Sequence, residues 1–285
     1  MSLETREKHQ VGKVSPACRI YDYLPGKFSV IPSRKGIKKA LKRGQIYRNG
    51  EIIHESDYIY EGDIIELKIS EKLTKPYLKK INVFHEDDFL AVVDKPPGLV
   101  VSGNQWKTLE HALIHNLKIS EQNDYLPFPL ATHRIDAMTS GLVLIAKTYK
   151  TRRQLGEMFK NSEVSKGYYA VVYGKTDTDF EIRTPIGDKA AKTTFSLIKS
   201  KTIEGEAVSL LNCNPVTGRK HQIRIHLKEN GTPIIGDKVY GESRTKFDNK
   251  SMFLCSCRLE FLHPITREKL AFERDLPKKF RSLIE

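Results

Sequence analysis

The sequence lacks any long hydrophobic run. Apolar stretches such as residues 89–93 and 142–146 are only five residues long, whereas a helix that spans a membrane needs about 20. The N-terminal segment MSLETREKHQ is charged and has no apolar stretch of the kind found in a signal peptide. We therefore expect a cytoplasmic protein that does not enter a membrane, although its positive charge would also suit an anionic membrane surface.

Cysteine is scarce, and the motifs of common cofactors are missing. The 285-residue chain has four cysteines and no Cys-x-x-Cys pair, so we expect free thiols in a reducing compartment. Residues 174–176 resemble the end of a phosphate-binding P-loop, but that pattern needs glycine where Tyr169 stands. The sequence contains neither Gly-x-Gly-x-x-Gly nor His-Glu-x-x-His. We therefore expect no metal and no cofactor.

Acidic residues are outnumbered by basic ones. The chain has 48 Lys and Arg against 35 Asp and Glu, a formal charge of +13, which makes nucleic acid the leading partner class. Residues 34–48 include no acidic residue to form the i,i+4 pairs that solvated helices favour. We interpret this stretch as an RNA-binding surface, with a solvated helix face as the alternative. Its basic residues are Arg34, Lys35, Lys38, Lys39, Lys42, Arg43 and Arg48.

The same stretch predicts a helix. Ser33 is a typical N-cap residue, and Gly44 is a typical left-handed residue after a helix end. Between them Ile37, Ala40 and Leu41 recur at helical spacing and predict one apolar face. The lysines fall largely off that face, so the helix is expected to expose its positive charge.

A hairpin is expected directly after this helix. Asn49-Gly50 favours a type I′ turn between strands at 45–48 and 51–53, and a further strand is expected over 64–69. Helix and hairpin together predict a small N-terminal domain over residues 15–70 with one strongly basic face.

The remaining chain predicts a larger second domain over residues 81–285, after a polar linker at 71–80. Its strands and helices mix without regular alternation, which favours an α+β domain with a mixed, largely antiparallel sheet. The expected strands are 81–84, 89–94, 142–147, 167–173, 207–213 and 253–261. The expected helices are 108–117, 149–160, 219–228 and 277–284.

Three polar segments of this second domain could carry chemistry. HRIDAMTSG at 133–141 precedes the apolar strand 142–146, and its turn-forming residues could hold Asp136 in a loop at a strand end. Asp136 could equally be an ordinary turn residue. TGRKHQIRIH at 217–226 opens a helix whose nitrogen donors suit anionic groups, unless it is an ordinary basic helix. Tyr168 could stack on a base or belong to the core.

These motifs identify a resemblance. HRIDAMTSG is similar to the His-Arg-Leu-Asp-x-x-Thr-Ser-Gly signature of the RluA-like RNA pseudouridine synthases, with Ile135 in place of leucine. The family's other elements are matched in the same order by KPPG at 95–98, KGYYA at 166–170, TGRKHQIRIH at 217–226 and PIIGD at 233–237. Residues 19–69 look like the alpha-L RNA-binding module that often precedes this catalytic domain.

The resemblance implies that the protein converts uridine to pseudouridine in RNA without a cofactor. Asp136 would be the catalytic carboxylate, by nucleophilic attack or by proton abstraction at the sugar, and both routes stay open. Arg224 would be the cation that orients it, Tyr168 would contact the base, and Arg134 would fill the space that the flipped base leaves. The other polar residues of the loop would hold its shape: His133, Thr139 and Ser140.

We expect a monomer that acts on RNA, with large-subunit ribosomal RNA first and transfer RNA possible. One alternative is a non-catalytic RNA-binding or ribosome-assembly protein on the same scaffold, which leaves Asp136, Tyr168 and Arg224 unexplained. Another is an enzyme of free nucleotides, which needs no extended basic surface. The chain departs from the family at 254–256, where Leu-Cys-Ser replaces the usual Leu-His-Ala. We therefore expect the side-chain contacts near the last strand to differ from those of other family members.

Overall fold

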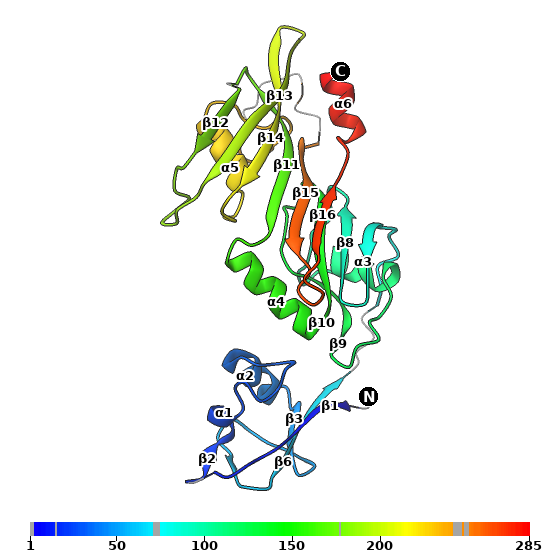
Figure 1. The fold of residues 1–285 in the computed structure, drawn as a ribbon, viewed down its shortest axis with the longest axis vertical. Coiled ribbons are helices and arrows are strands. Elements are labelled where there is room, and N and C mark those ends of the chain that lie inside the picture. The colour runs from blue at the N-terminus through cyan, green and yellow to red at the C-terminus, as the bar shows by residue number, and fades with distance from the viewer. Residues whose placement is uncertain (1–2, 15, 71–74, 177, 242–246, 248–250) are drawn as a thin grey trace. The chain divides into compact units, whose positions relative to one another are not determined.

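The chain divides into two compact units (Figure 1). The computed structural model describes residues 3–14, 16–70, 75–176, 178–241, 247 and 251–285. Unit 1 consists of Met1–Lys75 with Asn123–Pro127, and unit 2 of Pro76–Gln122 with Phe128–Glu285. The domain expected over 15–70 falls within unit 1, and that expected over 81–285 falls within unit 2 apart from 123–127. The expected linker, 71–80, lies partly outside the described residues.

Unit 1 contains the expected basic helix, α2 (Arg34–Lys42). Ser33 caps it, because its Oγ accepts a hydrogen bond from the backbone N–H of Gly36 at 3.1 Å. Gly44 follows with φ of +61°, a left-handed conformation that costs glycine little. Ile37, Ala40 and Leu41 are buried. The predicted helix, its two ends and its apolar face are therefore confirmed.

The expected hairpin of unit 1 is also confirmed. Asn49 and Gly50 have φ of 51° and 90°, as a type I′ turn requires, and they join β3 (Ile46–Arg48) to β4 (Glu51–Ile52). The strand expected over 64–69 is β6 (Ile64–Ser70), which pairs with β3 and with the unpredicted β1 (Leu3–Gln10). The short elements β2 (Cys18–Arg19), α1 (Ile20–Tyr23) and β5 (Tyr58–Ile59) complete the unit.

Unit 2 is built on a sheet that has ten strands among the described residues. Its order is β12-β13-β14-β11-β15-β10-β8-β7, with β16 beside β15 and β9 beside β10. The strands are β7 (Asn82–Glu86), β8 (Leu90–Lys95), β9 (Tyr125–Ala131), β10 (Ser140–Thr148), β11 (Ser165–Tyr173), β12 (Asp179–Ile182), β13 (Thr193–Ile203), β14 (Glu206–Pro215), β15 (Leu254–Leu262) and β16 (Lys269–Glu273).

The sheet is mixed and largely antiparallel, as expected. Antiparallel pairs join β7 to β8, β8 to β10, β11 to both β14 and β15, and β13 to both β12 and β14. β10 and β15 pair in parallel, with Ser140 opposite Cys255 and Gly141 opposite Ser256. The α+β fold class is therefore confirmed. Four strands were not predicted: β9, whose two prolines weaken a strand signal, and β12, β13 and β16.

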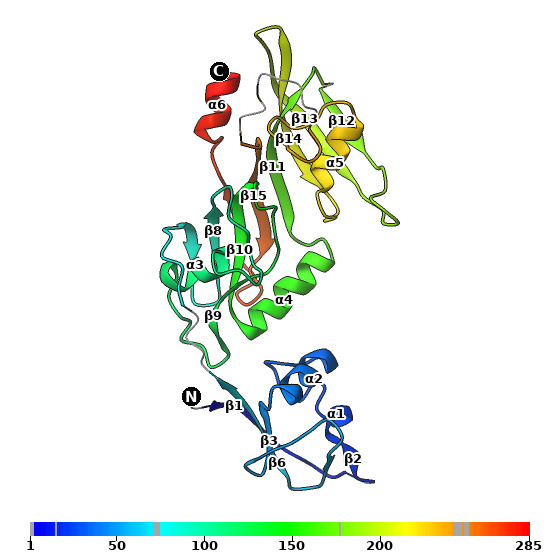
Figure 2. The same cartoon turned by 180° about the vertical axis from the view of Figure 1, so that it is seen from behind.

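The helices of unit 2 lie close to their predicted positions. They are α3 (Leu109–Asn116), α4 (Tyr149–Lys160), α5 (Gln222–Glu229) and α6 (Lys278–Ile284). α4 packs against β10, and Figure 2 shows α3 and α4 beside the part of the sheet that contains β8 and β10. The helix expected over 219–228 begins only at Gln222, because the preceding His221 has a left-handed φ of +57° that interrupts helical geometry.

The parallel pair of β10 and β15 requires a glycine. Gly141 has φ of +112°, and a Cβ built on it would lie 2.0 Å from the carbonyl oxygen of Ser256. Only glycine therefore permits this approach between the strands. The approach joins two apolar clusters of the unit, one around β11 and β14 and one around β8 and α3, and Tyr168 packs against both. This junction is where the polar motifs converge.

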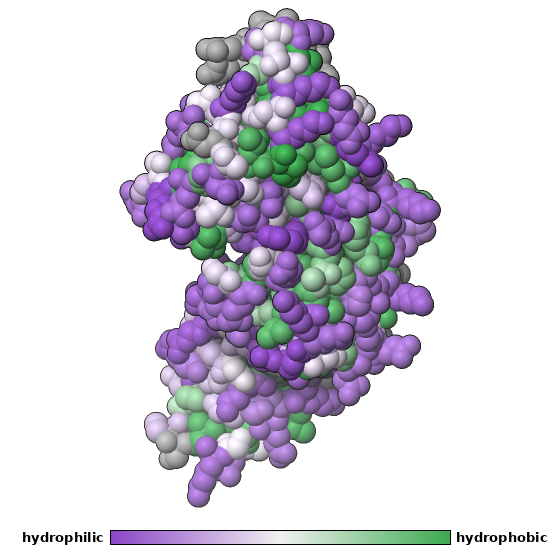
Figure 3. All heavy atoms as spheres, turned by 45° about the horizontal axis from the view of Figure 1, so that its top comes forward, coloured by the Kyte–Doolittle hydropathy of each residue, from purple (hydrophilic) through white to green (hydrophobic). Residues whose placement is uncertain are grey.

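Hydrophilic side chains predominate on the face of the protein that Figure 3 shows, and apolar side chains form smaller patches between them. No helix formed by the described residues has the length and apolar character that crossing a membrane requires. The described cysteines are free thiols, and three of them are buried: Cys213, Cys255 and Cys257.

Candidate active site

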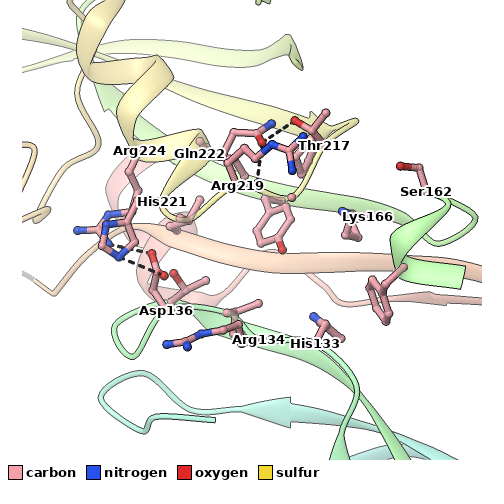
Figure 4. A pocket seen from close by; sticks show the side chains of 18 residues that line it. His133, Arg134, Asp136, Ser162, Lys166, Thr217, Arg219, His221, Gln222 and Arg224 are labelled. Atoms are coloured by element: carbon pink, nitrogen blue, oxygen red, sulfur yellow. Dashed lines mark hydrogen bonds and ion pairs between the residues drawn. The ribbon is translucent and has the colours of Figure 1, made fainter. Parts of the chain in front are cut away.

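A pocket of about 340 Å³ opens in unit 2 where the three polar motifs meet (Figure 4). Its wall comes from the loop before β10, the end of α4, the start of β11 and the segment 215–224. A cavity of this size suits a small organic group. Of the site residues expected from the sequence, the pocket brings together Asp136, Tyr168, Arg224 and Arg134.

Asp136 lies in the loop between β9 and β10. The backbone N–H of Thr139 donates to the carbonyl oxygen of Asp136 at 3.1 Å and closes a turn, and 25% of the Asp136 side chain stays exposed to the pocket. Lys95 holds the loop in place, because its buried amine donates to the carbonyl oxygen of Ala137 at 3.0 Å and to that of Leu99 at 2.7 Å. Asp136 is thus fixed in place yet open to a ligand.

Arg224 contacts the Asp136 carboxylate directly. Its Nη1 donates to Asp136 Oδ2 at 2.8 Å, while its Nε and Nη2 donate to the two oxygens of Asp237 at 2.6 and 2.8 Å. Burial lowers the pKa of Arg224, but the hydrogen bonds to Asp237 and Asp136 outweigh it and raise the pKa overall. The guanidinium therefore stays charged and is held in one orientation by Asp237.

Asp237 was part of a recognised motif, but the sequence assigned it no role. It is 5% exposed, and the backbone N–H groups of Val239 and Tyr240 donate to its Oδ1 at 3.0 and 3.1 Å. Burial raises the pKa of Asp237, whereas Arg224 and these N–H groups lower it, and the net shift is downward. A charged carboxylate inside the protein is stable only with such partners. Its place in the PIIGD motif was the available signal.

His221 is a second residue that the sequence did not single out. Its Nε2 lies 3.5 Å from Asp136 Oδ1, and its Nδ1 shares a hydrogen bond of 3.0 Å with the hydroxyl of Tyr240. Burial lowers the pKa of His221, opposed by the charge of Asp136. Figure 4 shows His221 and Arg224 together beside Asp136 at one end of the pocket. A left-handed backbone at a non-glycine residue is costly and often marks a functional site.

Tyr168 belongs both to the pocket wall and to the core. It lies near the start of β11 and packs against both apolar clusters of unit 2. Burial raises the pKa of its hydroxyl well above the usual range, so the phenol is neutral near pH 7. Tyr168 therefore belongs to the core, and its place in the pocket wall leaves it open to contact with a base, which stays a prediction.

The loop residues flanking Asp136 have different environments. Arg134 is exposed and lines the pocket. His133 accepts a hydrogen bond on Nε2 from the backbone N–H of Leu144 at 3.0 Å, and its ring lies 4.6 Å from that of Phe159. Burial lowers the pKa of His133 to about 3. A neutral imidazole that accepts from the backbone is consistent with the predicted role of holding the loop.

The unusual Leu254-Cys255-Ser256 segment lies at the back of the site. Leu254 lines the pocket, Cys255 is buried with its Sγ 3.4 Å from Arg274 Nη1, and the hydroxyl of Ser256 donates to the carbonyl oxygen of Leu142 at 3.1 Å. Ser256 thus ties β15 to β10. Within the described part of the chain, no three His, Cys, Asp or Glu side chains are grouped as metal ligands.

The basic residues expected to bind RNA lie in unit 1 and are largely exposed: most are on α2, Arg43 follows its end, and Arg48 is on β3. Two of them have acidic partners from elsewhere in the unit: Lys38 lies 3.1 Å from Glu55 and Arg34 lies 3.2 Å from Asp22. Arg48 is partly buried and donates to the carbonyl oxygen of Tyr58. Within the described residues no ion pair involves the other four: Lys35, Lys39, Lys42 and Arg43.

Comparison with known proteins places these features in a family. The RNA pseudouridylate synthase family matches residues 89–229. An "uncharacterized RNA pseudouridine synthase" of Aquifex aeolicus (strain VF5) is 32% identical over 280 residues, covering 88% of each chain. The "ribosomal large subunit pseudouridine synthase D" of Nitrosomonas europaea is 32% identical over 257 residues, covering 81% of this chain and 68% of the relative.

A third relative and a solved structure agree. The "ribosomal large subunit pseudouridine synthase C" of Rickettsia felis is 32% identical over 286 residues, covering 86% of this chain and 88% of the relative. The structure "Human RNA Pseudouridylate Synthase Domain Containing 1" has a TM-score of 0.58 at 22% identity, covering 70% of this chain and 84% of that one, and so shares the fold. The family resemblance found in the motifs is confirmed: the chain belongs to the RNA pseudouridine synthases, which are isomerases.

Proposed function

We propose that this protein converts uridine to pseudouridine in large-subunit ribosomal RNA, with Asp136 as its catalytic group. The observation that carries the proposal is the 2.8 Å contact between Asp136 and the Arg224 guanidinium inside the pocket. A carboxylate that is fixed in place and open to a ligand is what either chemical route requires. The ribosomal substrate is suggested by the names of the relatives from Nitrosomonas europaea and Rickettsia felis.

The reaction is an isomerisation, so its atoms balance without a co-substrate. The bond between N1 of the base and C1′ of the ribose breaks, the base turns, and a new bond forms between C5 and C1′. The proton on C5 is lost and N1 gains one. Asp136 would assist the first step by attack on C1′ or by taking a proton from the sugar. Arg224 would hold the carboxylate aimed at the ribose.

The base itself would be held by Tyr168. The phenol is neutral and lies in the pocket wall, which suits stacking against uracil or contact with its edge. A uridine inside a helix cannot reach such a pocket, so the target is flipped out or already unpaired. Arg134, exposed at the pocket rim, would occupy the space that the flipped base leaves.

Unit 1 would add affinity for RNA. We assign residues 15–70 as an alpha-L RNA-binding module whose basic face is formed by α2, with residues 81–285 as the catalytic domain. Lys35, Lys39, Lys42 and Arg43 support this assignment, because they are exposed and have no ion pair within the described residues. A smaller contribution is expected from Arg34, Lys38 and Arg48, because the first two pair with carboxylates and the third donates to a backbone carbonyl. Such contacts strengthen binding without reading sequence.

The decisive experiment maps new pseudouridines after incubation with unmodified large-subunit ribosomal RNA and, in parallel, unmodified transfer RNA. Pseudouridine at discrete positions of the ribosomal RNA, made by the parent protein and lost in Asp136→Asn, is the expected result. Modification of transfer RNA alone would replace the proposed substrate. Turnover by Asp136→Asn would remove Asp136 from its role. RNA binding without any pseudouridine would favour a non-catalytic RNA-binding protein.

A further inference from the structure

α4 exposes a stripe of positive charge next to the pocket. Thr151, Leu155 and Met158 form its buried side. At 100° per residue the opposite side is centred on Arg153 and Lys160, with Gly156 on one flank and the acidic Glu157 on the other, and all four are exposed. The helix has four basic residues and one acidic residue, so its outer surface carries a net positive charge.

The two cations of this stripe have no acidic partner. Within the described residues neither Arg153 nor Lys160 forms an ion pair, although Glu157 lies four residues after Arg153 and three before Lys160 on the same helix. Arg152, beside these cations, attracts the half-buried Glu110: burial raises the pKa of Glu110 and the charge of Arg152 lowers it in part. The charge of Arg153 and Lys160 is therefore available to a ligand.

Gly156 lies between these two cations without a structural reason to be glycine. It has no left-handed backbone, and a Cβ built on it would meet nothing within 4 Å. Glycine is less favourable than alanine inside a helix, so glycine at this position makes the helix less stable than alanine would. A missing side chain between two cations leaves room for another backbone to approach closely.

The stripe leads directly to the pocket. Phe159 and Ser162, at and just after the end of α4, line the pocket, and so does Lys166 on β11. Figure 4 shows Ser162 and Lys166 at the end of the pocket opposite to Asp136 and Arg224. The amine of Lys166 lies beside Gly218 and has no hydrogen bond or ion pair with a described residue. Cations thus continue from the pocket wall onto the helix.

We propose that RNA next to the target nucleotide leaves the pocket past Lys166 and runs along α4, with its phosphates at Lys160 and Arg153 and its backbone closest at Gly156. The proposal rests on the proposed function only in taking RNA as the substrate. It adds a binding surface in unit 2 to the α2 face of unit 1. Phosphate contacts of this kind position the strand and carry no sequence information.

The test measures affinity for an unmodified large-subunit ribosomal RNA transcript as a function of salt. All variants are made in the full chain with Asp136→Asn, so catalysis cannot change the RNA and the result does not depend on the role of Asp136. The double variant Arg153→Gln/Lys160→Gln should lower the slope of log affinity against log salt by about 1.4, since a single strand contributes about 0.7 per phosphate contact.

The matched control is Lys278→Gln/Arg281→Gln, which removes the same charge from α6. Both control residues are exposed, and α6 lies far from α4 in both views of the ribbon. The control should keep the slope of the parent. Equal losses in the two double variants would overturn the proposal, because they would reflect net charge alone.

Substitutions of Gly156 provide a second, independent test that changes no charge. Gly156→Gln should raise the melting temperature, because glutamine favours a helix, and should weaken RNA binding several-fold with an unchanged salt slope. Gly156→Ala should raise the melting temperature with a smaller effect on binding. RNA affinity of Gly156→Gln equal to that of the parent would show that no strand approaches the helix there.

Discussion

Asp237 holds the guanidinium of Arg224 through two hydrogen bonds of 2.6 and 2.8 Å, and this fixes the direction in which the third nitrogen meets Asp136. The pair is buried, so the bonds are little screened by water. Asp237 does not contact the pocket itself. It acts through Arg224: by fixing the guanidinium, Asp237 fixes the position of the Asp136 carboxylate.

Asp237→Asn should therefore lower the rate of the chemical step. Loss of one charged acceptor loosens the guanidinium, and a displacement of about 1 Å at a reacting group can cost roughly 100-fold in rate. We expect single-turnover rates to fall while RNA affinity stays near that of the parent. Asp188→Asn, an exposed aspartate on another loop, is the control. A fall in affinity with an unchanged rate would contradict the positioning role.

Tyr168→Ala should weaken productive binding of the target nucleotide by about 1–3 kcal/mol, the usual value of stacking between a base and an aromatic ring. Tyr168→Phe keeps the ring and should keep most of that binding. The concentration of RNA that gives half-maximal single-turnover rate measures this effect. Tyr169→Ala, at the neighbouring position on β11 but outside the pocket lining, controls for damage to the core. Equal effects of the two alanine variants would assign Tyr168 to packing alone.

Gly141→Ala should destabilise the fold by about 3 kcal/mol or more, because the new Cβ would meet the carbonyl oxygen of Ser256 in a backbone conformation that suits only glycine. Thermal unfolding measures the change. Gly12→Ala, where a Cβ would meet nothing within 4 Å, should change stability far less. A Gly141→Ala protein as stable as the parent would mean that β10 and β15 approach less closely.

Acid should remove the stability that comes from neutral His133. Burial lowers its pKa from the ordinary 6.5 to about 3 in the folded state, so below pH 6.5 the unfolded chain binds a proton that the folded chain does not. Stability from this group is full above pH 6.5 and falls toward pH 3, by at most about 1.4 kcal/mol per pH unit. Urea unfolding from pH 7.5 to pH 5 should show a shallower loss in His133→Gln. His115→Gln, at an exposed position, should follow the parent curve.

Two neighbouring lysines on the exposed surface of α2 should differ in their effect on RNA binding. Lys39 has no ion pair within the described residues, whereas Lys38 lies 3.1 Å from Glu55. Lys39→Ala should lower the salt slope of RNA affinity by about 0.7 to 0.9, as expected for one lost phosphate contact. Lys38→Ala should lower it by less, because its charge is partly compensated. Two unchanged slopes would assign this face to solvent rather than RNA.

Local features of this protein could be predicted from the sequence because neighbouring residues decide them. The cap at Ser33, the turn at Asn49-Gly50 and the full length of α4 follow from rules that act over a few residues. The motif around Asp136 and that around Arg224 could be recognised for the same reason. The limits of such reasoning show at β9, whose prolines obscured a strand that its neighbour β10 stabilises.

The sequence by itself determined the amphipathic elements, the excess of positive charge and the order of the motifs. Only the tertiary structure decided which of the polar residues meet. Asp136 and Arg224 are 88 positions apart and come together because β10 lies parallel to β15 at Gly141. The same holds for Asp237, His221 and Lys95, which reach the site only through contacts with residues distant in the sequence. Their contacts depend on strand pairing between distant segments, which is decided by the packing of the whole sheet rather than by local preference.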